Sequence, residues 1–158
     1  MADSKWKKVD ATDLIMGRMC TQIAKQSLLG TNIVIVNAKK VAISGRRNNV
    51  LEKYRDLMNV RTRSNPRHGP FHSSRPDTFL RQRIRFMLPK NERGKKALRR
   101  IHVYINGVPK PKINTYGDMD ELKIQNASAE RLSHKYITVG DVCTHIGWSG
   151  NSRDLAEI

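Results

Sequence analysis

The sequence predicts an α/β fold, with a small, mostly parallel sheet flanked by helices and with basic segments projecting from it. Near the amino terminus a strand pattern, a helix pattern and a buried strand pattern follow one another within about thirty residues. That order is typical of a right-handed βαβ unit with parallel strands. The chain has 158 residues, enough for one core but too few for two independent domains. We therefore expect a single domain over residues 1–158.

The first three elements make up this βαβ unit. Residues 6–10 give a short strand candidate that ends at a polar corner, Asp-Ala-Thr-Asp. Apolar side chains then recur every three or four residues from Ile15 to Leu28, as on one face of an amphipathic helix, and Gly30 is well placed to terminate it. Residues 33–37 read IVIVN, a β-branched run without polar alternation. Such a run is typical of a strand that is buried on both faces.

A second helix and a long loop follow. Residues 40–43 suggest a short extended piece, after which Ser44 is placed to cap a helix. The apolar face of that helix would hold Val50, Leu51, Tyr54, Leu57 and Met58. Residues 61–76 contain three X-Pro pairs and have no apolar period, so they predict an extended or turning loop.

The second half of the chain predicts two more helices and a third strand. Asp77 suits the first turn of a helix, and Pro89 ends it. Its core-facing stripe would be Leu80, Ile84, Met87 and Leu88. A short basic helix over about residues 93–100 leads into a strand at residues 101–105. Residues 110–158 form an extension in which only a short helix over residues 139–148 is suggested.

Positive charge is concentrated in the middle of the chain. The formal net charge is +16, and between Arg61 and Lys112 fifteen basic residues face only Asp77 and Glu92. Such a segment cannot be neutralised from within, so it calls for an external polyanion. Arg outnumbers Lys ten to three between residues 61 and 100, which favours bidentate binding of phosphate groups. The plain alternative is a solvated surface rich in cations, but the extent of the run favours nucleic acid.

The sequence lacks the motifs that are typical of several other function classes. No apolar run approaches the roughly 20 residues of a transmembrane helix. The turn after the first strand carries neither GxGxxG nor a P-loop lysine pattern, although ISGRR at residues 43–47 could bind an anion. Cys20, Cys143 and the five histidines show no metal-ligand spacing, so both thiols are expected to be reduced core residues. We expect no catalysis, cofactor, metal, membrane or small-molecule substrate.

Among nucleic acids the sequence favours RNA over DNA. It contains no helix-turn-helix, zinc-finger or bZIP pattern that would read DNA. The strands also lack the aromatic signature of a base-stacking RNA-recognition sheet. Aromatic residues have two possible roles here: Phe71 could anchor the basic loop or stack on a base, whereas Phe79, Phe86 and Trp148 are more typical of packing groups. His68 and His72 could contact RNA or serve only as polar loop residues.

Four stretches resemble the L-thirteen family of large-subunit ribosomal proteins. They read VDATDLIMGRMCTQIAKQSLLG at residues 9–30, NAKKVAISG at 37–45, NPRHGPFH at 65–72 and RIRFMLPKNERGKKALRRIHVYING at 83–107. The likeness covers about residues 6–109, and the NPxxGP loop is similar to the archaeal and eukaryotic cytosolic branch. The resemblance implies a three-layer α/β/α fold with a four-stranded parallel sheet. It also implies no enzymatic activity, and a place on large-subunit ribosomal RNA beside neighbouring ribosomal proteins.

The resemblance implies a cytoplasmic ribosome, which in a eukaryote is assembled in the nucleolus. It also implies which side chains face RNA. The RNA-facing set is Arg46, Arg47, Arg61, Arg63, Arg67, His68, Arg75, Arg81, Arg83, Arg85, Lys90, Arg93, Lys95, Lys96, Arg99 and Arg100. Two positions depart from the family pattern, Phe86 before the MLP segment and Lys112 after the second proline. The extended basic carboxy-terminal helix of many eukaryotic members is also missing, so no contact is carried over from it.

The function expected from these features is that of a structural RNA-binding protein of the large ribosomal subunit, which supports subunit assembly and translation. Two rivals remain open at this point. One is an RNA-binding regulator of translation that works off the ribosome. The other is a nucleotide-dependent enzyme acting on RNA, against which the missing phosphate-loop motif argues.

Overall fold

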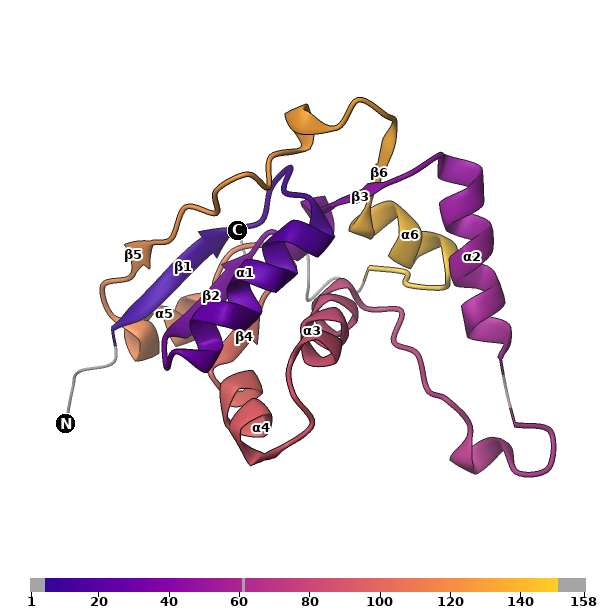
Figure 1. Cartoon of the computed structure of the whole chain (residues 1–158), viewed down its shortest axis with the longest axis horizontal. Coiled ribbons are helices and arrows are strands. Elements are labelled where there is room, and N and C mark those ends of the chain that lie inside the picture. Colours follow the sequence, from indigo (N-terminus) through magenta and orange to yellow (C-terminus); the bar gives the residue numbers. More distant parts are fainter. Residues whose placement is uncertain (1–4, 61, 151–158) are drawn as a thin grey trace.

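The computed structural model describes residues 5–60 and 62–150 of the chain, and four parallel strands form its central sheet (Figure 1). These strands are β1 (Trp6–Asp10), β2 (Asn32–Val36), β4 (Ile101–Val103) and β5 (Asp120–Glu121), in the order β4-β2-β1-β5. β2 is the central strand and pairs with β1 and β4 on its two sides. The predicted α/β fold with a mostly parallel four-stranded sheet is confirmed.

Helices cover both faces of this sheet. On one face α1 (Met16–Leu28), α3 (Pro76–Met87) and α4 (Glu92–Arg99) pack over Ile33 and Ile35 of β2. On the other face Tyr116 of α5 (Lys110–Tyr116) packs over Val34 and Val36. Because side chains alternate along a strand, the uninterrupted apolar run of β2 fills two separate cores. The result is three layers, α/β/α.

The stripes predicted for α1 and α3 contribute several residues to the larger core. Met19 and Ile23 of α1 and Leu80 and Ile84 of α3 are fully buried, each contributing about 1.5–3 kcal/mol by burial. The prediction for Met87 is wrong, because its side chain is 43% exposed. α3 ends at this residue, and the next residue, Leu88, takes an extended conformation that turns its own side chain into the core.

A second, smaller sheet lies beside the first. β3 (Ala42–Ser44) pairs antiparallel with β6 (Tyr136–Thr138), and α2 (Arg47–Asn59) and α6 (Val139–His145) pack around the pair. Ser44 does not cap α2, contrary to expectation: it is the last residue of β3, and the cap residue is Arg46, whose side chain makes no capping hydrogen bond. Gly45 between them has φ +137°, a conformation that favours glycine. Of the predicted α2 face only Val50 and Tyr54 are buried.

The remaining elements are short. Three 3₁₀ turns occur among the described residues, η1 (Ala38–Lys40), η2 (Pro66–His68) and η3 (Ala129–Arg131). β4 ends two residues earlier than the predicted strand, and α6 ends at His145 rather than near Trp148. Trp148 packs, partly buried, against the core as expected. Cys20 and Cys143 are buried free thiols, which confirms their predicted role as core residues.

Candidate nucleic-acid interface

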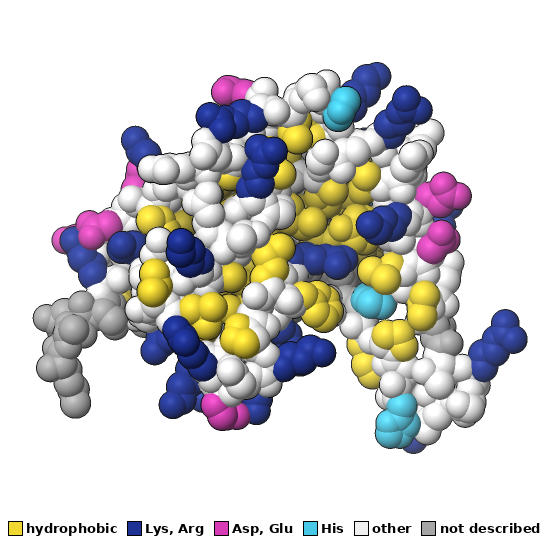
Figure 2. Space-filling view, in the orientation of Figure 1, with side chains coloured by type: hydrophobic (Ala, Val, Ile, Leu, Met, Phe, Trp, Pro, Cys, Tyr) yellow, Lys and Arg dark blue, Asp and Glu magenta, His cyan; other side chains and the backbone are white. Residues whose placement is uncertain are grey.

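The basic side chains of the predicted RNA-facing set fall into three groups. The first lies along the edge of α3 and around α4, the second at the turn between β3 and α2, and the third in the loop between α2 and α3. In the space-filling view Lys and Arg side chains gather around α4 at the lower edge of the molecule (Figure 2). The loop between α2 and α3 extends away from the body (Figure 1).

α4 is fixed tightly to the body of the protein. The side chain of Asn91 caps it by accepting a hydrogen bond from the backbone N–H of Gly94, at 3.0 Å. Gly94 also lies against the backbone of Pro89, where an added Cβ would stand 1.9 Å from the carbonyl oxygen. On the buried side the hydroxyl of Ser27 donates to the carbonyl of Ala97 at 2.6 Å. With that side buried, the basic residues of α4 face solvent.

Most cations of this group are exposed. On α3, Arg81 and Arg85 are one helical turn apart and share an edge, while Lys90 lies in the turn that leads to α4. On α4 itself the exposed cations are Arg93, Lys95, Lys96 and Arg99. The structure thus brings together on one surface residues that the sequence spreads over nineteen positions. A dense row of guanidinium and ammonium groups of this kind can hold several phosphates at once.

Three predicted site residues already have partners within the protein. Arg75 forms a bidentate pair with Asp77, at 3.2 Å from Nε to Oδ1 and 3.1 Å from Nη2 to Oδ2. Lys95 approaches Glu92 at 2.6 Å, and Arg100 donates to the carbonyl of Ser27 at 3.4 Å. The first two pairs lie at the surface, where an ion pair contributes little to stability. A phosphate group could therefore compete with Asp77 and Glu92 for these two cations.

Arg83 differs from its neighbours on α3. Its guanidinium lies over the rings of Tyr54 and Phe79, 5.3 and 5.0 Å from their centroids. Its Nε is buried and has no hydrogen-bond partner within the described part of the chain. Burial raises the pKa of the Tyr54 hydroxyl, and the charge of Arg83 opposes that shift. Arg83 thus links α3 to α2 through cation–π contacts, a role that the sequence did not predict.

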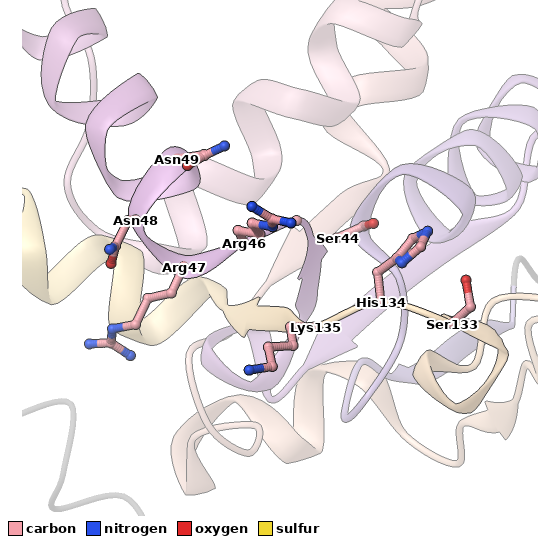
Figure 3. Close-up of a pocket in the computed structure, with 9 residues that line it drawn as sticks. Ser44, Arg46, Arg47, Asn48, Asn49, Ser133, His134 and Lys135 are labelled. Carbon is pink, nitrogen blue, oxygen red and sulfur yellow. The ribbon is translucent and has the colours of Figure 1, made fainter.

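The turn between β3 and α2 opens into a hollow of about 820 Å³ (Figure 3). Arg46 and Arg47 line it from one side, and His134 and Lys135 line it from the segment before β6. Strand pairing explains the approach, since Ser44 lies opposite Tyr136 and the N–H of Gly45 donates to the carbonyl of Lys135 at 3.1 Å. Among the residues that the structure describes, no acidic side chain lines this hollow. Sequence reasoning missed His134 and Lys135, and no local signal marks them.

The loop between α2 and α3 carries the third group. Arg63, Arg67 and His68 are exposed, and Arg61 lies outside the described residues. The side chain of Asn65 accepts a hydrogen bond from the backbone N–H of Arg67 at 3.1 Å, which shapes a local turn. Gly69 is buried at the end of that turn. The loop therefore presents its cations from a short ordered turn.

The pKa values of Cys20, Tyr54, His102 and Cys143 are shifted mainly by burial. Burial raises the pKa of both cysteine thiols to about 12, so neither is a nucleophile at neutral pH. Burial also lowers the pKa of His102, and the charges of Arg81 and Lys112 lower it further. A hydrogen bond with the Arg99 backbone acts in the opposite direction and raises that pKa. Among the described residues no three His, Cys, Asp or Glu side chains are grouped as metal ligands. Nor does any helix there have the length and apolarity to cross a membrane.

Comparison with known proteins assigns the chain to a family. The family model described as Ribosomal protein L13 matches residues 4–111. The chain belongs to the ribosomal protein L13 family. Members of this family are structural components rather than enzymes. The match spans β1 to the start of α5 and thus includes all three groups of predicted cations. His134 and Lys135 lie outside it.

Curated relatives extend the similarity beyond that region. A protein of Methanosarcina barkeri is 41% identical over 142 residues, which cover 88% of this chain and 96% of the relative. One of Methanococcoides burtonii is 40% identical over 141 residues, with the same two coverages. One of Sulfolobus acidocaldarius is 40% identical over 140 residues, covering 88% and 91%. All three are named large ribosomal subunit protein uL13, in agreement with the family branch that the NPxxGP loop indicated.

Proposed function

We propose that this L13-family protein is a structural constituent of the large ribosomal subunit, where it binds and stabilises folded large-subunit RNA. Its surroundings would then be the cytoplasmic ribosome and the neighbouring ribosomal proteins. The names of the relatives support an assignment to the large ribosomal subunit, and the exposed cations support RNA as the ligand. We infer that the protein supports subunit assembly by fixing the relative positions of the RNA segments that it contacts.

The observation that carries this proposal is the basic surface formed by α3 and α4. Arg81, Arg85 and the exposed cations of α4 lie on a rigid base and face outward. Because the helices are held by a packed core, little conformational entropy is lost when the basic side chains meet RNA. Phosphate contacts then set the position of the protein, and the shape of the folded RNA supplies most of the specificity.

The proposed interface has three parts, one for each of the three groups of cations described above. To the residues named from the sequence we add His134 and Lys135, since they share a hollow with Arg46 and Arg47. The side chains of Arg47 and Lys135 point to the same side of the β3–β6 pair (Figure 3). Arg83 contributes mainly by holding α3 against α2.

The test is a charge reversal on α3. The double variant Arg81→Glu/Arg85→Glu should bind a folded fragment of large-subunit RNA at least about a hundredfold more weakly, since two phosphate contacts become repulsive. Its melting temperature should stay close to that of the wild type, because both side chains are exposed. Affinity is measured by filter binding, and incorporation by sedimentation of reconstituted or cellular ribosomes.

The matched control is Lys110→Glu/Lys123→Glu, which makes the same change of charge at exposed positions away from α3 and α4. It should bind RNA far better than the α3 variant. Loss of stability with RNA binding intact would show that the two arginines are structural. A protein that binds RNA but does not travel with large subunits in stoichiometric amount would instead be a regulator working off the ribosome.

A further inference from the structure

Two large aromatic side chains are exposed on the basic surface. Phe71, at the end of the loop, is 75% exposed, and Phe86, near the end of α3, is 66% exposed. Phe79, the other phenylalanine of the chain, is buried in the core. The departure at Phe86 therefore does not disturb the packing of α3, because its ring points away from the core. Exposed rings of this size amid cations call for a ligand with both apolar faces and negative charge.

Each ring borders its own hollow, and the two hollows are adjacent. Phe71 lines a hollow of about 280 Å³ together with Arg81 and Arg85. Phe86 lines another of about 460 Å³ together with Arg85 and Lys90. Arg85 and Leu98 line both hollows, so Arg85 is shared by the two aromatic sites. Within residues 5–60 and 62–150, no aspartate or glutamate lines either hollow.

We propose that Phe71 and Phe86 each stack on an unpaired RNA base, and that Arg85 binds the phosphate between the two nucleotides. Arg81 and Lys90 are placed to hold the phosphates on either side. This inference rests on the proposed function and deepens it, because it makes a looped or splayed-out single strand the ligand of the α3–α4 surface. Base stacking on aromatic rings together with a cationic track along the backbone is the general way in which proteins bind single-stranded RNA.

The chemistry favours RNA over a protein segment as the occupant. A protein partner would have to bring acidic groups to several cations in addition to apolar side chains. RNA supplies one phosphate for every base, and so matches a surface on which cations and rings alternate. The aromatic character of both exposed groups also favours flat bases, since an aliphatic surface would serve a protein partner equally well.

The experiment compares two RNA probes. One is a single strand of about ten adenine-rich nucleotides carrying 2-aminopurine near its centre, and the other is a fully paired duplex of similar length. Phe71→Ala/Phe86→Ala should bind the single strand about ten- to a hundredfold more weakly and lose the quenching of 2-aminopurine that stacking causes. Its affinity for the duplex should stay within about twofold of the wild type, because the phosphate contacts remain.

Two further variants separate stacking from simple apolar contact. Phe71→Trp/Phe86→Trp should keep both affinity and quenching, whereas Phe71→Leu/Phe86→Leu should lose them as the alanine variant does. Ile113→Ala is the control for exposed apolar surface elsewhere, since this side chain is 44% exposed and lines neither hollow. It should behave like the wild type towards both probes. Unchanged melting temperatures verify that every variant is folded.

The outcomes distinguish this inference from the proposed function. Single-strand binding that survives both the alanine and the leucine variants overturns the stacking proposal while leaving ribosomal RNA binding intact. Single-strand binding that the leucine variant retains and the alanine variant loses would show apolar contact with RNA without stacking, and it also overturns the stacking proposal. A wild-type protein that binds folded ribosomal RNA but not the single strand also overturns stacking. A wild-type protein that binds no RNA at all overturns the proposed function itself.

Discussion

Gly94 lies in the first turn of α4, three residues after the capping side chain of Asn91. Its missing side chain lets the helix approach the backbone of Pro89, to which an added Cβ would come within 1.9 Å of the carbonyl oxygen. Backbone atoms cannot give way as the end of a flexible side chain can. The position of this one residue therefore decides how the exposed cations of α4 are presented.

We predict that Gly94→Ala lowers the free energy of unfolding by about 1–3 kcal/mol, as overpacking does. In most helix positions the same change is neutral or stabilising by up to about 1 kcal/mol. Gly17 in α1 is the matched control, because nothing lies within 4 Å of its added Cβ. Urea denaturation of the two variants measures both effects. Equal stabilities for Gly94→Ala and Gly17→Ala would contradict the close approach.

At the scale of elements, the pairing of β3 with β6 decides how far the basic surface extends. Each strand has three residues, too few to give a clear alternation in the sequence. Their antiparallel register sets Ser44 opposite Tyr136 and thereby brings Lys135 beside the turn that carries Arg47. Two segments about ninety residues apart in the chain thus share one hollow. The contact between Arg83 and the rings of Tyr54 and Phe79 joins α2 and α3 in a similar way.

We predict that Lys135→Glu weakens binding to folded large-subunit RNA by about tenfold or more, as removal of one phosphate contact and addition of a repulsive charge should do. Lys123→Glu, an exposed lysine of the same carboxy-terminal region that lies next to β5, should change the affinity by about twofold at most. Filter binding at constant salt measures both variants. Equal effects of the two substitutions would mean that the hollow at the β3–α2 turn is not part of the interface.

At the scale of the whole molecule, the charges are unevenly distributed over a compact fold. The net charge is +16, yet residues 113–158 hold four basic and seven acidic side chains. Cations therefore predominate on the surfaces of α3, α4 and the preceding loop, while the carboxy-terminal segment adds acidic groups near β5. In the proposed function, a field with this asymmetry would orient the protein towards RNA before contact and would make the affinity depend on salt.

The salt dependence follows from the number of phosphates that are neutralised. If about six are contacted, the affinity for folded large-subunit RNA should fall about a thousandfold between 50 and 200 mM salt. In Arg81→Glu/Arg85→Glu the same titration should give a shallower slope, because fewer counterions are released. A flat slope for the wild-type protein would mean that charge does not drive the binding, and it would remove the main support for the proposed interface.

Elements with a strong local pattern could be predicted from the amino-acid sequence. The stripes of α1 and α3 and the apolar run of β2 report their burial directly, because each is long enough for its periodicity to show. The clustering of basic residues along the chain likewise predicts an RNA-binding surface, and this stays a prediction. Met87 was the exception within these elements, since the helix ends at that residue and the core position passes to Leu88.

Only the tertiary structure decided which distant segments meet. β5 and β6 have two and three residues, and they form by pairing with β1 and β3, which lie far from them in the chain. The same folding placed Lys135 beside Arg47, turned Arg83 onto two rings, and left Phe71 and Phe86 exposed at two hollows that share Arg85. Local periodicity records whether a side chain is buried, but not what it touches. Contacts between remote parts of the chain depend on strand register and helix packing, which arise only when the whole core assembles.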